Sequence, residues 1–226
     1  MRCKMDQEAA PTSKSAPDKP TQPRWLDWTM RLQAIAQNGL AYAANAYDTE
    51  RYNAIRQIAA EMLAAGSGAE VSAVRDLLSH ESGYATPKVD VRGVVFRDEK
   101  LLLVRERQEG RWSLPGGWAD VGESPAQSVA REILDESGFE TRAVKLLAVF
   151  DRCRHPHEPP FAFHVYKLFF LCRIVAGEAK TSAETDATGF FGEGEIPELS
   201  LGRVTPWQIQ RCFEYRRNPN LPVDFD

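Results

Sequence analysis

Residues 114–139 restrict the fold more than any other part of the chain, because a loop rich in proline and glycine leads directly into a short helix with clear signals at both ends. Ser124 is a good N-cap residue, Pro125 suits the first helical position, and Gln127 can complete a capping box with Ser124. Gly138 is typical of a residue that ends a helix. The segment therefore predicts a loop that is tied to the start of a helix.

The predicted helix has an apolar face and an acidic face. Glu132 and Glu136 are four residues apart and Asp135 is three residues from Glu132, so the three carboxylates share one region of the helix surface. Like charges at this spacing repel by about a few tenths of a kcal/mol per pair, and a divalent cation would replace the repulsion by coordination. The simpler interpretation is a solvated acidic face. The positions expected to face a sheet are Ala126, Val129, Ala130, Ile133 and Leu134.

Oxygen ligands of this kind suit Mg²⁺ or Mn²⁺, which keep several waters and bridge to phosphate oxygens. The glycine-rich loop allows backbone to approach the same place, and the carbonyl of Gly116 is a candidate further ligand. Arg131 is expected to pair with Glu123 across the junction of loop and helix. That pair would hold the loop against the carboxylates.

Composition limits the class of partner. The 28 Lys and Arg against 32 Asp and Glu give a formal charge of −4, so there is no overall basic field to attract nucleic acid or an anionic membrane. The four cysteines are scattered and form no CxxC pair, which argues against a zinc ribbon or a dense disulfide framework. No apolar run approaches the roughly 20 residues that cross a bilayer, and no signal-peptide pattern is present. We therefore expect a cytoplasmic protein.

The chain divides into three expected parts: a disordered leader over 1–23, a helical domain over 24–82, and a catalytic α/β domain over 83–226. In the helical part we expect a long first helix, a second helix capped by Asp48 and a short third helix near 69–79. The expected buried face of the first helix comprises Trp28, Leu32, Ile35, Ala36, Leu40, Ala43 and Tyr47. Such a module packs on the catalytic domain or on a second subunit, or has a binding function of its own.

After Pro87 the apolar pattern changes to that of strands, with runs at 89–96, 101–104, 144–150 and 163–174 and a further candidate at Phe190 and Phe191. A last helix is expected to begin near Pro206. Mixed strands with a few helices imply an α/β sandwich.

The spaced string from Gly117 to Phe139 resembles the Nudix box, written G-x5-E-x7-R-E-U-x-E-E-x-G-U with U an apolar residue. Eight of its nine specified positions match, the exception being Asp135 where the pattern has Glu. The resemblance implies a Nudix α/β/α sandwich with a mixed sheet, preceded here by the helical domain. It also implies a pyrophosphatase that uses Mg²⁺, or Mn²⁺ in its place.

In the Nudix family the acids of the box bind metal, which implies Glu132, Asp135 and Glu136 as ligands here, with the Gly116 carbonyl. Glu132 and Glu136 would be the indispensable pair, and Arg131 and Glu123 complete the expected catalytic set. Many members add an acid from a later loop. The candidates for that acid are Glu184, which we place in the metal set, and Asp186, with an exposed polar turn as the simpler interpretation.

Substrate phosphates need cationic partners, and the candidates are Arg92, Arg105, Arg107 and Arg152, each of which has a surface charge as its alternative interpretation. The candidates for stacking on a base are Trp118, Trp112, Phe161 and Phe163, with a place in the core as the alternative. We treat His155, His157 and His164 as substrate-side or surface residues, since they show no metal-ligand pattern.

Residues 28–52 are similar to the helical N-terminal domain of a Nudix subfamily acting on X-linked nucleoside diphosphates. That likeness implies a homodimer and, as the leading reaction, hydrolysis of CDP-choline to CMP and phosphocholine. ADP-ribose is the alternative substrate, and RNA is a secondary one. A non-enzymatic Nudix-fold nucleotide sensor is the alternative of another class, against which the intact acids argue.

Overall fold

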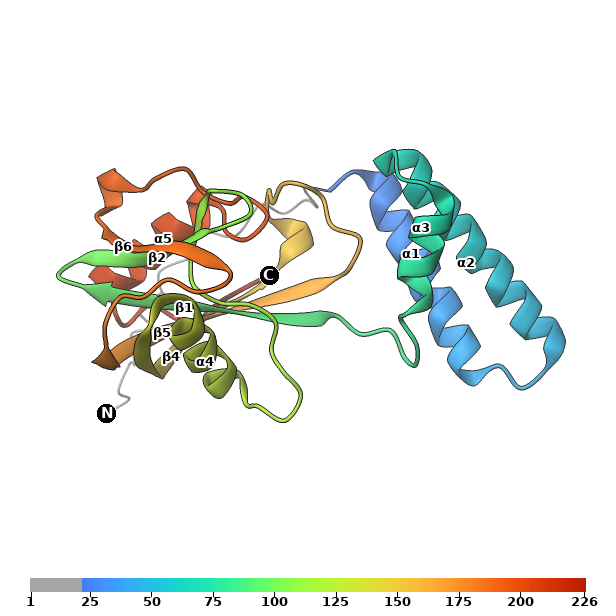
Figure 1. The fold of residues 1–226 in the computed structure, drawn as a ribbon. Coiled ribbons are helices and arrows are strands. Elements are labelled where there is room, and N and C mark those ends of the chain that lie inside the picture. Colours follow the sequence, from blue (N-terminus) through green and yellow to red (C-terminus); the bar gives the residue numbers. More distant parts are fainter. Residues whose placement is uncertain (1–21) are drawn as a thin grey trace, which may run out of the picture.

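The computed structural model describes residues 22–226, so the leader expected over 1–23 lies almost wholly outside the described part. Figure 1 shows an elongated molecule in which three helices stand at one end and a sheet covered by helices forms the rest. The boundary expected at residues 82 and 83 falls in the loop between these two parts. None of the helices described is long and apolar enough to cross a membrane.

The helical part consists of α1 (Arg24–Tyr42), α2 (Ala46–Ser67) and α3 (Val71–Ser79). The N-cap of α2 is Asn45, whose side chain accepts from the Asp48 N–H, so the cap expected at Asp48 is three residues too late. The small core of this part comprises Leu26, Ala60, Leu63, Ala64, Val74 and Leu78.

The buried face expected for the first helix is correct only in part. Ala36 is buried as expected, but Trp28 is 46% exposed and Ile35 is 54% exposed. Ala43 and Tyr47 lie beyond the end of α1 at Tyr42. The other buried residues of α1 are Leu26, Thr29, Gln33 and Gln37. Among the large apolar side chains of α1, Leu26 packs in the small core, whereas Trp28 and Ile35 point outward.

The sheet is mixed, as expected. Its strands are β1 (Lys88–Arg97), β2 (Lys100–Glu106), β3 (Trp112–Ser113), β4 (Phe139–Asp151), β5 (Val165–Gly177), β6 (Thr185–Phe191) and β7 (Asp224–Phe225). The order is β3-β2-β1-β5-β4-β7, and β6 pairs with β2. β1 runs parallel to β5, with Asp90 opposite Lys167, and β4 runs parallel to β7, while the other pairs are antiparallel. Two short 3-10 turns follow β4 and β6, at Arg152–Arg154 and Glu193–Glu195.

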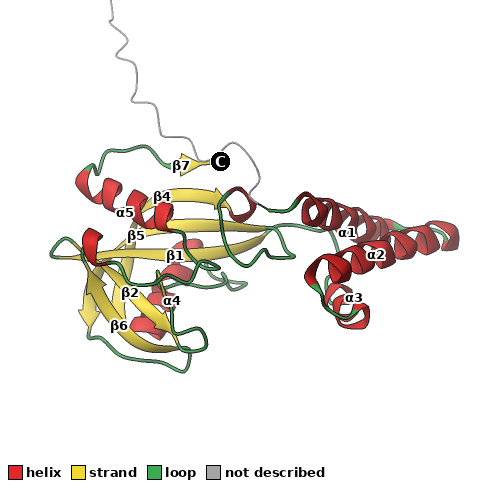
Figure 2. Cartoon of the chain, turned by 90° about the horizontal axis from the view of Figure 1, so that it is seen from above, coloured by secondary structure: helices red, strands yellow, loops and turns green. Residues whose placement is uncertain are grey.

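Helices cover both faces of the sheet, which confirms the α/β/α sandwich (Figure 2). α4 (Pro125–Ser137) packs Val129 and Ile133 on one face, and α5 (Pro206–Arg217) packs Ile209 and Phe213 on the other. Neighbouring strand residues alternate between the two cores, because successive side chains of a strand point to opposite faces. Leu101 and Leu103 belong to the core under α5, and Leu102 to the core under α4.

The ends of α4 are as expected. Ser124 and Gln127 form a complete capping box, Pro125 is the first helical residue, and Gly138 ends the helix with φ 78°. Its apolar face is narrower than expected, since Ala126 and Leu134 are exposed. Two large side chains, those of Val129 and Ile133, are enough to anchor a helix of this length to the sheet.

Candidate active site

A cavity of about 770 Å³ lies beside the second half of α4. We call it the main cavity. Its walls come from the loop 116–118, from α4, from the first halves of β1 and β5, and from three later loops that contribute residues 159–161, 182–184 and 202–203. It therefore joins the acidic helix to segments far away in the sequence.

The glycine loop is pressed tightly against its neighbours. At Gly116 φ is 143°, and a Cβ there would lie 2.0 Å from the backbone oxygen of Val91. A Cβ at Gly117 would lie 2.9 Å from a carboxylate oxygen of Glu132. The Gly116 N–H donates to Oε2 of Glu136 at 2.8 Å. Only glycine allows the loop to come this close to both acids.

Glu136 is the most deeply buried acid of the helix, with 4% of its surface exposed. Burial raises the pKa of its carboxyl to about 8, and the nearby carboxylates of Glu106 and Glu132 add to the shift, while Arg92 and the Gly116 N–H oppose it. Burial also raises the pKa of Glu132, against the hydrogen bond from Arg131. Buried carboxyl groups of this kind are oxygen donors that a divalent cation would stabilise in their charged form.

Arg131 organises the acids around the junction of loop and helix. It donates to both oxygens of Glu123 at 3.0 and 3.1 Å, as expected, and to Glu132 at 2.9 Å. Asp120 lies 3.0 Å away and Asp135 3.6 Å away. The Asp135 side chain is 60% exposed, against 15% for Glu132. Asp135 therefore lies at the outer edge of the acidic wall.

The donor set fits Mg²⁺ or Mn²⁺, because Glu132, Asp135 and Glu136 offer only oxygens and the glycine loop leaves room beside them. Within residues 22–226 the ligand oxygens of these three acids are not gathered within 4.8 Å of one another. Arg131 holds Glu132 and the Gly116 N–H holds Glu136 instead. A cation that replaced Arg131 and the Gly116 N–H as partners would coordinate both carboxylates.

A buried group with two cations forms another part of the cavity wall. Asp90, Arg92 and Lys167 all line the main cavity and are at most 5% exposed. Asp90 accepts from Arg92 at 2.9 and 2.6 Å and from Lys167 at 2.7 Å. Burial lowers the pKa of Lys167 to about 7, with Asp90 opposing and Arg92 adding to the shift. Of the three residues, only Arg92 was expected from the sequence. Polar residues inside an apolar strand, such as Asp90 and Lys167, indicate a buried polar site.

Arg152 and two aromatic residues complete this wall. Arg152 is 6% exposed, donates to the Pro159 carbonyl at 2.9 Å, and lies 5.2 Å from the ring centre of Phe161. The rings of Trp118 and Phe161 are stacked, with centroids 6.4 Å apart and planes at 25°. Trp112 packs against Phe191 instead, outside the main cavity. The structure thus places Arg92, Arg152, Trp118 and Phe161 around one space.

Arg105 and Arg107 do not line the main cavity. Arg105 pairs with Asp186 at 2.7 Å, and Arg107 donates to backbone carbonyls of residues 182, 183 and 185. Both arginines therefore hold the turn that carries Glu184. Glu184 itself lines the cavity, so of the two loop acids expected from the sequence it is the one that faces the site.

Two of the three histidines lie elsewhere than expected, whereas the His164 side chain is 40% exposed. His155 and His157 are buried, at 1% and 6% exposure, so a surface position is wrong for both. The His157 Nδ1–H donates to the Leu201 carbonyl at 2.8 Å, which joins the loop after β4 to a later loop. His164 and Phe163 face the helical part and not the main cavity. The positions of these histidines could not be predicted from the sequence, because they depend on how distant loops pack.

An α/β/α sandwich that places a carboxylate helix beside a glycine loop, in a cavity that buried cations also line, is the arrangement expected of a metal-dependent phosphoanhydride hydrolase. The chain matches the NUDIX domain family over residues 86–209, and residues 23–78 match a UDP-X-like N-terminal oligomerisation domain. The chain therefore belongs to the Nudix hydrolase family and carries its helical N-terminal domain. It is a Nudix pyrophosphatase, and such hydrolases generally use divalent metal ions.

Relatives extend the likeness over most of the chain. A Bacillus subtilis protein with the provisional name ADP-ribose pyrophosphatase is 44% identical over 205 residues, covering 91% of this chain and 98% of its own. The structure of a UDP-X diphosphatase is 33% identical, with a TM-score of 0.58, covering 92% of this chain and all of its own. The structure of an ADP-ribose pyrophosphatase from Streptococcus suis is 40% identical, with a TM-score of 0.56, covering 62% of this chain and all of its own.

Proposed function

We propose that this protein hydrolyses the pyrophosphate bond of a nucleoside diphosphate linked to a second group, with Mg²⁺ as the cofactor and ADP-ribose as the preferred substrate. The observation that carries the proposal is that the acids of α4 and three buried cations line the same cavity. Those cations are Arg92, Lys167 and Arg152. A diphosphate bound in this cavity would lie within reach of both the cations and the metal ligands.

In this proposal each residue of the site has a defined role. Glu132 and Glu136 hold the cation with Asp135 and the Gly116 carbonyl, while Arg131 and Glu123 fix the helix and loop. When bound, Mg²⁺ polarises phosphoryl oxygens and lowers the pKa of a coordinated water. Arg92, Lys167 and Arg152 neutralise the diphosphate charge. Glu184 accepts the proton of the attacking water, because it is the loop acid that faces the cavity.

The stacked rings of Trp118 and Phe161 offer a flat apolar surface for the base. The cavity volume lies in the range that encloses a ligand of nucleotide size. Two of the relatives above carry the name ADP-ribose pyrophosphatase, and one of them aligns with the helical part as well. We therefore rank ADP-ribose above CDP-choline, which reverses the order suggested by the helical region alone.

A substrate panel tests the proposal. Purified protein with Mg²⁺ is incubated with ADP-ribose, CDP-choline, UDP-linked sugars, NADH and nucleoside triphosphates, and the products are separated by chromatography. We expect AMP and ribose 5-phosphate from ADP-ribose at the highest kcat/KM. A higher kcat/KM for CDP-choline than for ADP-ribose would make CDP-choline the preferred substrate. The absence of turnover with every member of the panel would support a nucleotide sensor. An RNA arm at the same metal concentration tests RNA, for which we expect little cleavage.

The helical part supports a homodimer. The matching family model is described as an oligomerisation domain, and α1 leaves Trp28, Ile35 and Tyr42 exposed at intervals of seven residues. Residues seven apart lie on one side of a helix. We propose that this apolar stripe packs against a second copy of the chain.

A further inference from the structure

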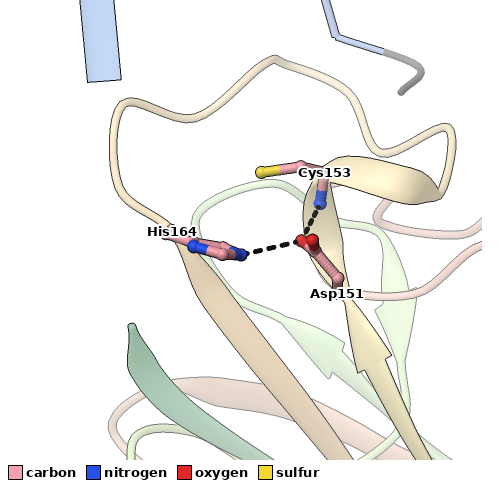
Figure 3. A group of neighbouring side chains, drawn as sticks. All are labelled: Asp151, Cys153 and His164. Atoms are coloured by element: carbon pink, nitrogen blue, oxygen red, sulfur yellow. Dashed lines mark hydrogen bonds and ion pairs between the residues drawn. The ribbon is translucent and has the colours of Figure 1, made fainter. Parts of the chain in front are cut away.

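A second group of ligand-bearing side chains lies outside the main cavity. Asp151 ends β4, Cys153 follows in the 3-10 turn, and His164 immediately precedes β5. One carboxylate oxygen, the thiol sulfur and one imidazole nitrogen all lie within 4.8 Å of one another. His164 Nε2 is 3.2 Å from Asp151 Oδ1, and the Cys153 N–H donates to the same oxygen at 2.9 Å. Figure 3 shows the carboxylate and the imidazole facing each other, with the sulfur beside them.

This group, which we call the seam cluster, borders a second cavity of about 370 Å³ between the helical part and the sheet. Asp27 and Gln33 of α1 line the same cavity. Gln33 is 9% exposed, and neither its amide oxygen nor its amide nitrogen has a hydrogen-bond partner within the described part of the chain. An unpartnered buried amide in the cavity that the three ligand atoms border indicates that this cavity holds polar material.

The ligand types identify the class of ion. One sulfur, one nitrogen and one carboxylate oxygen suit Zn²⁺ and similar thiophilic cations, which take four ligands in a tetrahedron. Mg²⁺ is excluded by its preference for oxygen ligands in an octahedron. The cavity has room for a water as the fourth ligand, and Asp27 is a protein alternative from the helical part.

The seam cluster is connected to the main cavity through the chain itself. Asp151 and Cys153 flank Arg152, whose side chain lines the main cavity and contacts Phe161. His164 lies at the other end of the same loop. A cation held by the three residues would therefore fix both ends of the segment that carries Arg152 and Phe161 to the substrate side.

We propose that Asp151, Cys153 and His164 bind a thiophilic divalent cation, represented by Zn²⁺, and that this ion positions Arg152 and Phe161 in the main cavity. Coordination converts the Cys153 thiol to a thiolate and releases its proton to solvent. The binding part is independent of the proposed function, whereas the effect on substrate rests on it.

Binding is tested with Co²⁺, which shows a thiolate-to-metal charge-transfer band only when a cysteine is a ligand. Full-length protein is stripped with a chelator, returned to excess Mg²⁺ and titrated with Co²⁺. Among residues 22–226 no cysteine lines the main cavity, so a cation held there by the acids of α4 should give no such band. We expect a band that saturates at one Co²⁺ per chain and is displaced by Zn²⁺.

Variants assign the band to the residues. Cys153→Ser should abolish it and His164→Ala should weaken Co²⁺ binding at least about tenfold. The matched control is His80→Ala, which removes an exposed histidine outside the cluster and should leave the titration unchanged. Absence of a band in the wild type overturns the proposal, and a band that persists in Cys153→Ser does the same. The contact of His164 with Asp151 would then be an ion pair that closes the loop.

Two further measurements separate binding from positioning. Zn²⁺ at about a hundredfold excess over its Kd should raise the Tm by about 5 °C in the wild type and not in Asp151→Asn, a variant that keeps the cysteine. Zn²⁺ should also lower the KM for the best substrate at least about fivefold, with a smaller change in kcat. A shift in Tm without a change in KM would overturn the positioning role and still support the binding site. If no substrate is turned over, the Co²⁺ and Tm results still decide the binding site.

Discussion

Glu136 and Asp135 are neighbours in the sequence, but their carboxylates have different surroundings. Glu136 is buried and accepts from the Gly116 N–H, whereas the Asp135 side chain is 60% exposed at the edge of the acidic wall. A buried acid beside the glycine loop is placed to hold a cation, and an exposed one contributes mainly through its charge. The two residues therefore form a matched pair for testing the metal assignment.

We expect Glu136→Gln to lower kcat by more than about 100-fold, because changes to groups that merely support a metal ligand already cost about 10–100-fold. Asp135→Asn should cost clearly less. Both rates are measured by steady-state kinetics at saturating Mg²⁺, with circular dichroism as the check on folding. Near-normal turnover in folded Glu136→Gln would contradict the assignment of this residue.

Lys167 is the cation that the sequence did not single out. Its ammonium group faces the main cavity and donates to Asp90 at 2.7 Å. We expect Lys167→Met to raise the KM at least about tenfold, since a charge-assisted hydrogen bond contributes about 1.5–3 kcal/mol. Arg92 still pairs with Asp90 in this variant, so the carboxylate is not left unpaired. Lys167→Arg, which keeps the charge, should recover part of the affinity. An unchanged KM in folded Lys167→Met would remove Lys167 from the substrate site.

At the scale of elements, the loop before α4 depends on two glycines for different reasons. We expect Gly116→Ala to destabilise the fold by on the order of 3 kcal/mol, because its Cβ would meet the Val91 carbonyl and its φ of 143° disfavours a side chain. Urea unfolding measures the loss. A small change in stability would show that the loop can move away from β1.

Gly117→Ala provides the contrast. Its Cβ would meet the end of the Glu132 side chain, which can rotate, so we expect a loss of stability of about 1 kcal/mol or less. The displaced carboxylate should lower turnover at least about tenfold. Kinetics and urea unfolding of both variants distinguish a residue that supports the fold from one that makes room for a ligand. Equal losses of stability would contradict this distinction.

The loop after β4 is held by a buried neutral histidine. Burial lowers the pKa of His157 to about 3, with the positive charge of Lys167 contributing. Because the folded pKa lies below the unfolded value of about 6.5, the unfolded chain binds a proton that the folded chain does not bind between these values. The free energy of unfolding is therefore fully maintained above pH 6.5 and falls as the pH drops through this window.

We expect His157 to account for about 2 kcal/mol of stability lost between pH 7 and pH 5. His157→Asn, whose amide can still donate to the Leu201 carbonyl, should show a correspondingly flatter profile. Urea unfolding at a series of pH values measures both curves. Identical slopes in the two proteins would show that other groups control the pH dependence.

At the scale of the whole molecule, the helical part directs an apolar stripe away from its own core. We expect the double variant Trp28→Glu with Ile35→Glu to be a monomer where the wild type is a dimer, because charges at the centre of an apolar interface are not solvated. Size-exclusion chromatography with light scattering measures the mass. Val175→Glu, which changes an exposed apolar residue at the end of β5, is the control. A dimer that survives the double change would place the interface elsewhere.

The sequence by itself determined the local features of the site. The capping box, the helix end at Gly138 and the pairing of Arg131 with Glu123 all follow from residues within one loop and one helix. The mixed sheet and its two covering helices were also expected, because strand and helix periods are visible in the chain. These features depend on neighbours a few residues away, and that is the range over which side-chain patterns act.

The tertiary structure alone decided which distant residues share the main cavity. Asp90 and Lys167 are 77 residues apart in the sequence and pair because β1 lies parallel to β5. The register between the two strands cannot be predicted from either strand alone. Tertiary structure also decided that Arg105 and Arg107 support a turn and which face of α1 is buried. Packing between elements selects among faces that have similar apolar content. The reaction class was therefore visible in the box from Gly117 to Phe139, whereas the substrate wall was not.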